Sequence, residues 1–194
     1  AYRTAIRLDP DNVIVYSNLG FMLVDQRRYE EAEVLHRESQ RLDPHDAVTS
    51  YALGNALYFQ ERYEEAEAAY REALRLDPDY VFAYRALGLT LSNQGRYEEA
   101  EAAHREAIRL EPDDAAAYNS LGNALRNQGR YEEAEVAYLE ALRLSPDDAI
   151  TYYALGLTLR NQGRLAEVET VYQEVIRINP DDAITYISFG NALY

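Results

Sequence analysis

The sequence has 194 residues, of which 47% are hydrophobic and 27% are charged, enough of each to form a core and to cover it. Its formal net charge of -15 argues against general binding to nucleic acid or to an anionic membrane surface. Cysteine is absent, which excludes disulfides, a thiolate nucleophile and cysteine metal ligands but does not fix the compartment. No apolar run approaches the roughly 18 residues that a membrane-spanning helix needs.

Proline and glycine recur along the whole chain with a period of 34 residues. The prolines are Pro10, Pro44, Pro78, Pro112, Pro146 and Pro180. The glycines form two series with the same spacing: Gly20, Gly54, Gly88, Gly122, Gly156 and Gly190, then Gly95, Gly129 and Gly163. A fixed period of this length predicts a tandem-repeat protein.

We number each repeat so that its proline is position 32, and the repeats then follow in chain order. Residues 1–12 are predicted to be the second helix of a preceding repeat. The complete repeats are 13–46, 47–80, 81–114, 115–148 and 149–182. Residues 183–194 are predicted to be the first helix of a truncated repeat. We expect all of them to form one solenoid domain and the native protein to be longer.

Each repeat is predicted to be a pair of antiparallel α-helices. In 115–148, apolar residues have helical spacing on both sides of the segment 127–130. Gly129 suits the left-handed conformation that ends a first helix, and Pro146 stops the second. Asp148 is a plausible N-cap for the next helix. The same position is occupied by Asn12, Asp46, Asp114 and Asp182, whereas Tyr80 breaks the pattern.

Small residues explain how the two helices come together. We expect Gly122 to face Ala134, which would let the backbones approach closely. In the last repeat Val168 replaces that alanine, so we expect it to face Gly156 and to widen the hairpin slightly. Because one hairpin alone exposes an apolar face, neighbouring hairpins must stack into an extended superhelix with first helices inside and second helices outside.

At these positions the chain resembles the tetratricopeptide-repeat family. Leu-Gly is usual at positions 7 and 8 and leucine at position 11. The other matching residues are Tyr16, Tyr84, Tyr118, Tyr152 and Tyr186 at position 4, Tyr29, Tyr63, Tyr97 and Tyr131 at 17, Ala32, Ala66, Ala100 and Ala134 at 20, and Tyr70, Tyr138 and Tyr172 at 24. The departures are Ser50, His36, His104 and Val168. The resemblance implies an all-α, right-handed superhelical α-solenoid of antiparallel helix hairpins with 34-residue repeats.

The resemblance also implies a protein-interaction role, in which an extended or helical peptide lies in a concave groove lined by positions 2, 5, 9, 12 and 13. Toward the N-terminus these positions are apolar and aromatic, with Phe21, Val24, Tyr51, Asn55, Tyr58 and Phe59, followed by Arg85 and Leu89. Toward the C-terminus they are polar, with Asn119, Asn123, Arg126, Asn127, Tyr153, Arg160 and Asn161.

We expect thirteen of the eighteen tyrosines, at positions 4, 17 and 24, to belong to the core. Tyr51, Tyr58, Tyr153 and Tyr194 fall instead on the groove and are candidate anchors, with partial burial against the next repeat as the alternative. One hypothesis is a peptide whose apolar part meets the Phe21–Phe59 half of the groove and whose acidic part meets Arg126 and Arg160. The other is that these arginines are solvated and have no dedicated ligand.

The carboxylate clamp of chaperone-binding tetratricopeptide domains is not expected here. Arg85 would suit its basic position, but Leu89 and Ser120 replace its two asparagines. Asn119 and Asn123 do no better, because Ala154 and Ile184 follow at the other positions.

No enzyme site, cofactor or metal is predicted. His36 and His104 replace a core aromatic and His45 lies in a turn, and no phosphate-binding loop is present. Two alternatives to a peptide-binding scaffold stay open. The chain could be the substrate-recruiting arm of a larger enzyme such as a glycosyltransferase. It could also self-associate head to tail, with Tyr2, Ala5 and Ile6 docking on Tyr186, Phe189 and Leu193 of another copy.

Overall fold

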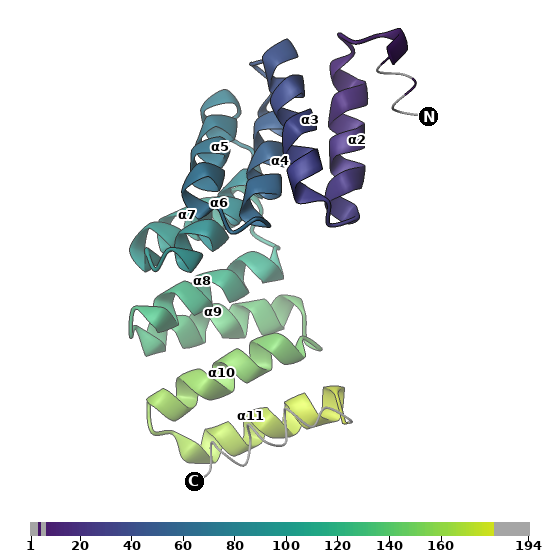
Figure 1. Ribbon diagram of the computed structural model, residues 1–194. Coiled ribbons are helices and arrows are strands. Elements are labelled where there is room, and N and C mark those ends of the chain that lie inside the picture. Colours follow the sequence, from purple (N-terminus) through teal and green to yellow (C-terminus); the bar gives the residue numbers. More distant parts are fainter. Residues whose placement is uncertain (1–3, 5–6, 181–194) are drawn as a thin grey trace. The chain divides into compact units, whose positions relative to one another are not determined.

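The computed structural model describes residues 4 and 7–180, and within them every regular element is a helix. The chain divides into two compact units, Ala1–Arg96 and Tyr97–Tyr194 (Figure 1). The first unit contains α2 (Val13–Asp25), α3 (Tyr29–Leu42), α4 (Ala47–Tyr58), α5 (Tyr63–Leu76) and α6 (Val81–Asn93). The second contains α7 (Tyr97–Leu110), α8 (Ala115–Asn127), α9 (Tyr131–Leu144), α10 (Ala149–Asn161) and α11 (Leu165–Ile178). This tandem arrangement of helical hairpins confirms the fold class. The predicted last helix, 183–194, lies outside the described residues. So do all six residues named for head-to-tail docking.

Acidic and amide side chains cap the first helices of four repeats, as predicted. Asp46 Oδ1 accepts a hydrogen bond of 3.0 Å from Val48 N, and Asp114 Oδ1 accepts one of 3.0 Å from Ala116 N. Asn12 and Asp148 cap α2 and α10 in the same way. Helix α6 begins after Tyr80 without a side-chain cap. The recurring capping residue therefore sets where each of these four first helices begins.

A residue in the left-handed conformation joins the two helices of each repeat. Gly129 has a φ of 77°, which confirms its predicted role. In the first two repeats the equivalent residues are not glycines, yet Arg27 and Glu61 have φ values of 59° and 61°. The turn geometry is thus kept even where the side chain disfavours it.

In four first helices, the group nearest to the Cβ position of the glycine is the aromatic ring at position 24. A Cβ added to Gly122 would lie 2.6 Å from Tyr138 Cε1, and its nearest neighbours are all atoms of that ring. The prediction that Gly122 faces Ala134 therefore left out the ring that lies nearest to this glycine. At Gly156 the nearest atoms belong to Tyr172, the closest at 2.9 Å, and not to Val168. The small residue makes room for a large ring, and the ring fills the hairpin.

The aromatic residues at position 24 are the largest side chains of the core. Tyr70, Tyr138 and Tyr172 are fully buried, and so are His36 and His104 where they replace the tyrosine. The tyrosines at position 17 are only half-buried, namely Tyr29, Tyr63, Tyr97 and Tyr131. The expectation that thirteen tyrosines are core residues is correct for Tyr16, Tyr70, Tyr138 and Tyr172. It is too broad for position 17 and for Tyr84, Tyr118 and Tyr152 at position 4, which are half-buried. Tyr2 and Tyr186 lie outside the described residues.

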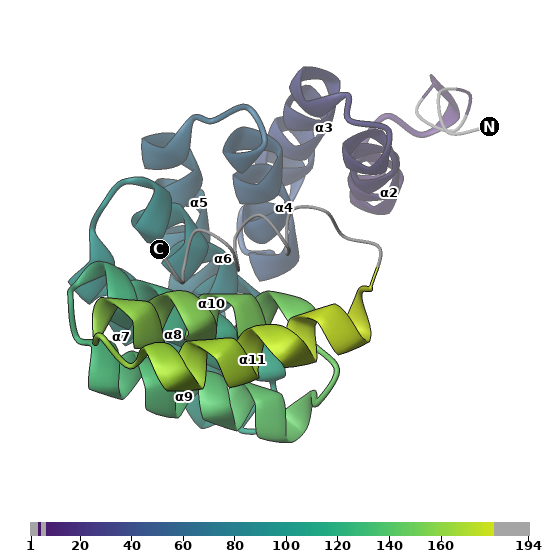
Figure 2. The ribbon, with the colours of Figure 1, turned by 90° about the horizontal axis from the view of Figure 1, so that it is seen from below.

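Successive first helices lie closer together than successive second helices. Within the first unit α4 contacts both α2 and α6, and within the second α10 contacts α8 as well as α9 and α11 (Figure 2). Among the described residues no comparable contact joins α3 to α5 or α9 to α11. Within each unit, the first helices are therefore the more tightly spaced layer and the second helices the more open one.

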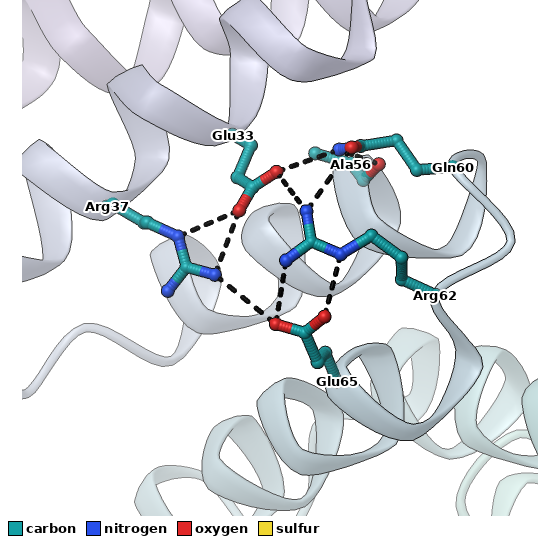
Figure 3. A network of polar contacts seen from close by, with 6 residues as sticks. All are labelled: Glu33, Arg37, Ala56, Gln60, Arg62 and Glu65. Carbon is teal, nitrogen blue, oxygen red and sulfur yellow. Dashed lines mark hydrogen bonds and ion pairs between the residues drawn. The ribbon is translucent and has the colours of Figure 1, made fainter.

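A network of ion pairs links the second helices of neighbouring repeats (Figure 3). Glu33 Oε2 accepts hydrogen bonds from Arg62 Nη1 at 2.6 Å and from Gln60 Nε2 at 3.0 Å. Its other oxygen pairs with Arg37 at 2.8 Å. Arg62 also forms two bonds of 2.7 Å to Glu65. Equivalent contacts join Glu67 to Gln94 and Arg96, Glu101 to Gln128 and Arg130, and Glu135 to Gln162 and Arg164.

The glutamates of this network lie on the second helices, and each is paired with an arginine of the next repeat. Partial burial acts to raise the pKa of Glu33, but hydrogen bonds from Gln60 and Arg37 and the charge of Arg62 outweigh it and hold that pKa below its ordinary value. The Glu33 side chain is only 13% exposed, so its partners are partly shielded from water. Arg62, Arg96, Arg130 and Arg164, which directly precede second helices, therefore each join two neighbouring repeats.

Candidate peptide-binding groove

A cavity of about 290 Å³ opens on the first unit between α4 and α6. It is lined by Tyr51, Asn55, Tyr58, Phe59, Tyr70, Phe82, Arg85, Ala86 and Leu89. Six of these residues are among the eight that the repeat numbering placed on this half of the groove. We refer to this cavity as the aromatic cavity.

Aromatic rings form most of the walls. The Tyr51 ring lies 5.2 Å from that of Tyr80 and 6.5 Å from that of Phe82. At the other end the rings of Tyr58 and Phe59 are 5.5 Å apart in an edge-to-face arrangement. Phe59 and Phe82 are about half exposed, at 50% and 52%, so their faces are available to a ligand. Rings already packed against each other are held in place and can bind an apolar side chain at little entropic cost.

The polar groups of the aromatic cavity come from three helices. Tyr70 of α5 donates a hydrogen bond of 2.8 Å from its hydroxyl to Asn55 Oδ1 of α4. Asn93 Nδ2 of α6 donates one of 2.9 Å to the Tyr58 hydroxyl. Arg85, also on α6, is half-buried in the lining. Burial raises the pKa of Tyr70, which therefore stays a neutral donor.

Two predicted residues of this half lie outside the cavity. Phe21 of α2 is half-buried, and its ring lies 5.3 Å from that of His36. Val24 packs against the core cluster that contains Leu19 and Leu23. Both residues contact their own hairpin, which leaves less of each side chain for a partner.

Three lining residues were missed from the sequence. Phe82 stands at position 2, which the family resemblance places in the groove, so that position was sufficient to find it. Tyr70 was expected in the core and is indeed buried, yet it also reaches the cavity. Ala86 stands at position 6, outside the expected lining positions, and nothing in the sequence pattern indicates that it lines the cavity.

In the second unit the groove asparagines bond to one another. Asn119 Nδ2 donates a hydrogen bond of 2.6 Å to Thr151 Oγ1, and Asn123 Nδ2 donates one of 3.0 Å to Asn119 Oδ1. Asn123 Oδ1 in turn accepts one of 2.9 Å from the Tyr138 hydroxyl. The chain of bonds starts at Asp148, which accepts from Thr151 at the beginning of α10. These amides already have partners within the protein, which reduces their capacity to hold a peptide backbone.

The remaining predicted residues of the second unit differ in exposure. Arg126 is half-buried, with Nη2 3.5 Å from Asn123 Oδ1. Asn127, Arg160 and Asn161 are exposed. Tyr153 is half-buried, and its ring lies 5.9 Å from that of Tyr172. The exposed side chains are the ones that a partner can reach without displacing contacts within the protein.

A different hollow, of about 710 Å³, is lined by residues of α7, α8 and α9. Tyr118, Leu121 and Leu125 line it from α8, and Val136 and Leu139 from α9. At position 25 the other repeats have Arg37, Arg71, Arg105 and Gln173, so Leu139 is the apolar exception that a comparison of repeats reveals.

Among the residues that the structure describes, no group of three or more histidine, aspartate and glutamate side chains is placed to hold a metal ion. None of the helices in residues 4 and 7–180 has the length and hydropathy needed to cross a membrane.

Hairpins in tandem, glycine–aromatic packing and a cavity on the first helices together define a helical-repeat protein of the interaction-scaffold class. Residues 1–185 match the family described as cilia and flagella-associated protein 70 C-terminal domain, a tetratricopeptide-repeat family. The chain belongs to this family. No curated protein gave a significant match to the sequence.

Solved structures with the same fold cover almost the whole chain. YrrB, described as a tetratricopeptide-repeat protein with an unusual peptide-binding site, is 24% identical with a TM-score of 0.79, and 97% of each chain is covered. MamA from Desulfovibrio magneticus RS-1 is 22% identical with a TM-score of 0.82, covering 88% of this chain and 97% of its own. A thermophilic repeat protein of Thermus thermophilus is 22% identical with a TM-score of 0.71, covering 94% and 99%. At these identities the likeness concerns the fold alone.

Proposed function

We propose that this chain binds a peptide segment of a partner protein in the groove formed by its first helices, and that it catalyses no reaction itself. The observation that carries the proposal is the aromatic cavity between α4 and α6. Pockets lined by aromatic side chains with a few polar groups are the usual form of a binding site. The family is one of interaction scaffolds, and YrrB, which shares the fold, is described as having a peptide-binding site.

The proposal is tested by selecting peptides from a displayed random library on the immobilised chain and measuring their affinity by isothermal titration calorimetry. The groove variant is Tyr51→Ala with Tyr58→Ala, and Leu89→Asp is a second variant at a site that is 45% exposed. We expect both to weaken binding at least about 10-fold, since truncating an aromatic anchor commonly removes more than 1 kcal/mol.

The matched control changes apolar residues on a second helix. Val136 and Leu139 of α9 are 68% and 51% exposed, so Val136→Ala with Leu139→Ala removes a similar apolar area away from the groove. Circular dichroism and thermal unfolding establish that each variant is folded. Binding that survives the groove changes, or that falls equally in the control, would contradict the proposal.

For the second unit we propose that Arg126 and Arg160 meet an acidic part of the same partner, with Asn119, Asn123, Asn127, Tyr153 and Asn161 beside them. The test is Arg126→Ala with Arg160→Ala in the same titration. Loss of affinity that diminishes at high salt supports an electrostatic contact. Unchanged affinity means that these arginines are solvated and have no dedicated ligand.

A further inference from the structure

The aromatic cavity contains no carboxylate, although the chain has 34 aspartate and glutamate residues. Its lining instead combines aromatic rings with Asn55, Tyr58 and Arg85. The protein as a whole is strongly acidic, whereas the lining of this half-enclosed site contains an arginine and no acid. The site therefore favours an acidic or acceptor-rich ligand over a basic one.

The hydrogen bonds within the protein determine what each polar group can offer. Because the Tyr70 hydroxyl donates to Asn55 Oδ1, the orientation of this amide is fixed and its NH₂ group is left to donate. Among the residues that the structure describes, Asn55 Nδ2 donates to no partner. The Tyr58 hydroxyl accepts from Asn93, so its own proton is available as a donor. Arg85 has only donors.

Asn123 provides a comparison at the same repeat position. It too accepts a hydrogen bond from a buried tyrosine, Tyr138, at 2.9 Å. Its NH₂ group, however, donates to Asn119 Oδ1 at 3.0 Å. The two amides are oriented alike, but only that of Asn55 keeps its donor for a ligand.

We propose that the aromatic cavity recognises a glutamate side chain of the partner peptide, with its carboxylate held by Asn55, Tyr58 and Arg85. This inference rests on the proposed function and names the ligand chemistry of that site. The two methylene groups of glutamate contact the rings of Tyr51 and Phe82, while the charged oxygens receive the donors. Charge-assisted hydrogen bonds of this kind are about twice as strong as neutral ones.

A side chain fits this cavity better than the C-terminal carboxylate of a peptide. A terminal carboxylate is attached directly to Cα and brings the backbone N–H of its residue with it. That N–H would compete with the Tyr70 hydroxyl for Asn55 Oδ1, the one amide carbonyl of the lining. Glutamate carries its carboxylate on an apolar stem and brings no such donor into the cavity.

The test selects peptides from random libraries displayed with a free and with a blocked C-terminus. On the unmodified chain we expect glutamate to be enriched over glutamine at one position in both libraries. Asn55→Asp replaces the donor by a carboxylate yet still accepts from Tyr70, so the enrichment should disappear. Asn18→Asp, at an exposed asparagine of α2 outside the proposed groove positions, is the matched control and should keep it.

Affinities of one selected peptide and its Glu→Gln form complete the test. We expect about a 10-fold preference for glutamate on the unmodified chain, which falls to less than about 2-fold on Arg85→Gln. Tyr70→Phe should also reduce the preference, because Asn55 then loses the bond that orients its amide. This effect on glutamate over glutamine distinguishes a positioning role from a merely structural one, which would weaken both peptides equally.

Three outcomes would overturn the inference. Peptides that bind in a Tyr51- and Tyr58-dependent manner but show no glutamate enrichment leave the proposed function standing and remove the glutamate site. Enrichment only in the library with a free C-terminus would mean that the cavity binds a terminal carboxylate and not a glutamate side chain. Binding that does not depend on Tyr51 and Tyr58 at all means that the proposed function itself has failed.

Discussion

Arg62, at the start of α5, donates a hydrogen bond of 2.6 Å to Glu33 of α3, 29 residues earlier, and so joins two repeats (Figure 3). The acid is also bonded to Gln60 and Arg37, so three side chains depend on one carboxylate. Because the bond crosses from one hairpin to the next, it stabilises the stacking of repeats and not the single helix. Nearest-neighbour interfaces of this kind supply much of the stability of a solenoid.

Replacing Glu33 by alanine should therefore destabilise the first unit. We expect the free energy of unfolding to fall by about 1 kcal/mol. The loss stays this small because Arg62 is partly exposed to water and still pairs with Glu65. The control is Glu38→Ala, which removes an exposed pair with Arg41 within one helix and should cost clearly less. Urea unfolding measures both. Equal losses would mean that the pairing between repeats adds nothing.

Replacing Glu61 by glycine should stabilise the protein. Glu61 has a φ of 61°, a region that costs a side-chain-bearing residue about 1 kcal/mol relative to glycine. The equivalent glycines have φ values of 74° to 77°, so the change adopts a geometry that other repeats already use. We expect thermal unfolding to show a gain of up to about 1 kcal/mol. Gly129→Ala is the reverse change and should destabilise by a similar amount.

The buried His36 should make stability depend on pH. Burial lowers its pKa from 6.5 to about 4, so the folded protein keeps this ring neutral. Between these values the unfolded chain binds the proton more readily, and stability is lost as pH falls from 6.5 toward 4. At the low end this contribution amounts to about 3 kcal/mol, from about 1.36 kcal/mol per pKa unit. Well above the ordinary pKa of histidine it vanishes.

His36→Phe should remove this contribution. Tyr70 shows that a six-membered ring fits against the glycine of the same hairpin position, 2.5 Å from the Cβ that Gly54 lacks. Thermal unfolding between about pH 5 and 7 separates the effect from the glutamates, whose ordinary pKa is 4.5. The exposed His45, changed to asparagine, is the control. A variant whose pH profile matches that of the unmodified chain contradicts the assignment.

The glycines of the first helices should not tolerate a methyl group. A Cβ at Gly54 would lie 2.5 Å from Tyr70 Cε1, and the bond from Tyr70 to Asn55 prevents the ring from moving freely. We expect Gly54→Ala to cost about 1–3 kcal/mol, the usual range for overpacking. At Gly156 the nearest atom, Tyr172 Cε2, is 2.9 Å away, so Gly156→Ala should cost less. Urea unfolding ranks the two variants, and the opposite order would show that ring contact does not set the cost.

Much of the local structure could be predicted because its causes lie within a few residues. Asp46 accepts from amides two and three residues later, and Gly129 needs only its own backbone freedom to reverse the chain. The place of Tyr51 and Tyr58 in the lining of the aromatic cavity followed from the family resemblance, which assigns their repeat positions to the groove. By contrast, the Tyr138 ring beside Gly122 was not predicted, because which side chain fills a gap depends on its size and rotamer as well as on the register.

The sequence by itself determined the repeat, the helices and the faces they present, since these depend on spacing, capping and backbone preference. Only the tertiary structure decided what the asparagines at position 9 can do. Asn55 and Asn123 are equivalent in sequence, and each accepts from a tyrosine 15 residues later. They differ because Asn119 stands beside Asn123 and is itself held by Thr151, 32 residues along the chain. Whether the NH₂ group of such an asparagine is bonded within the protein depends on neighbours that only folding brings together.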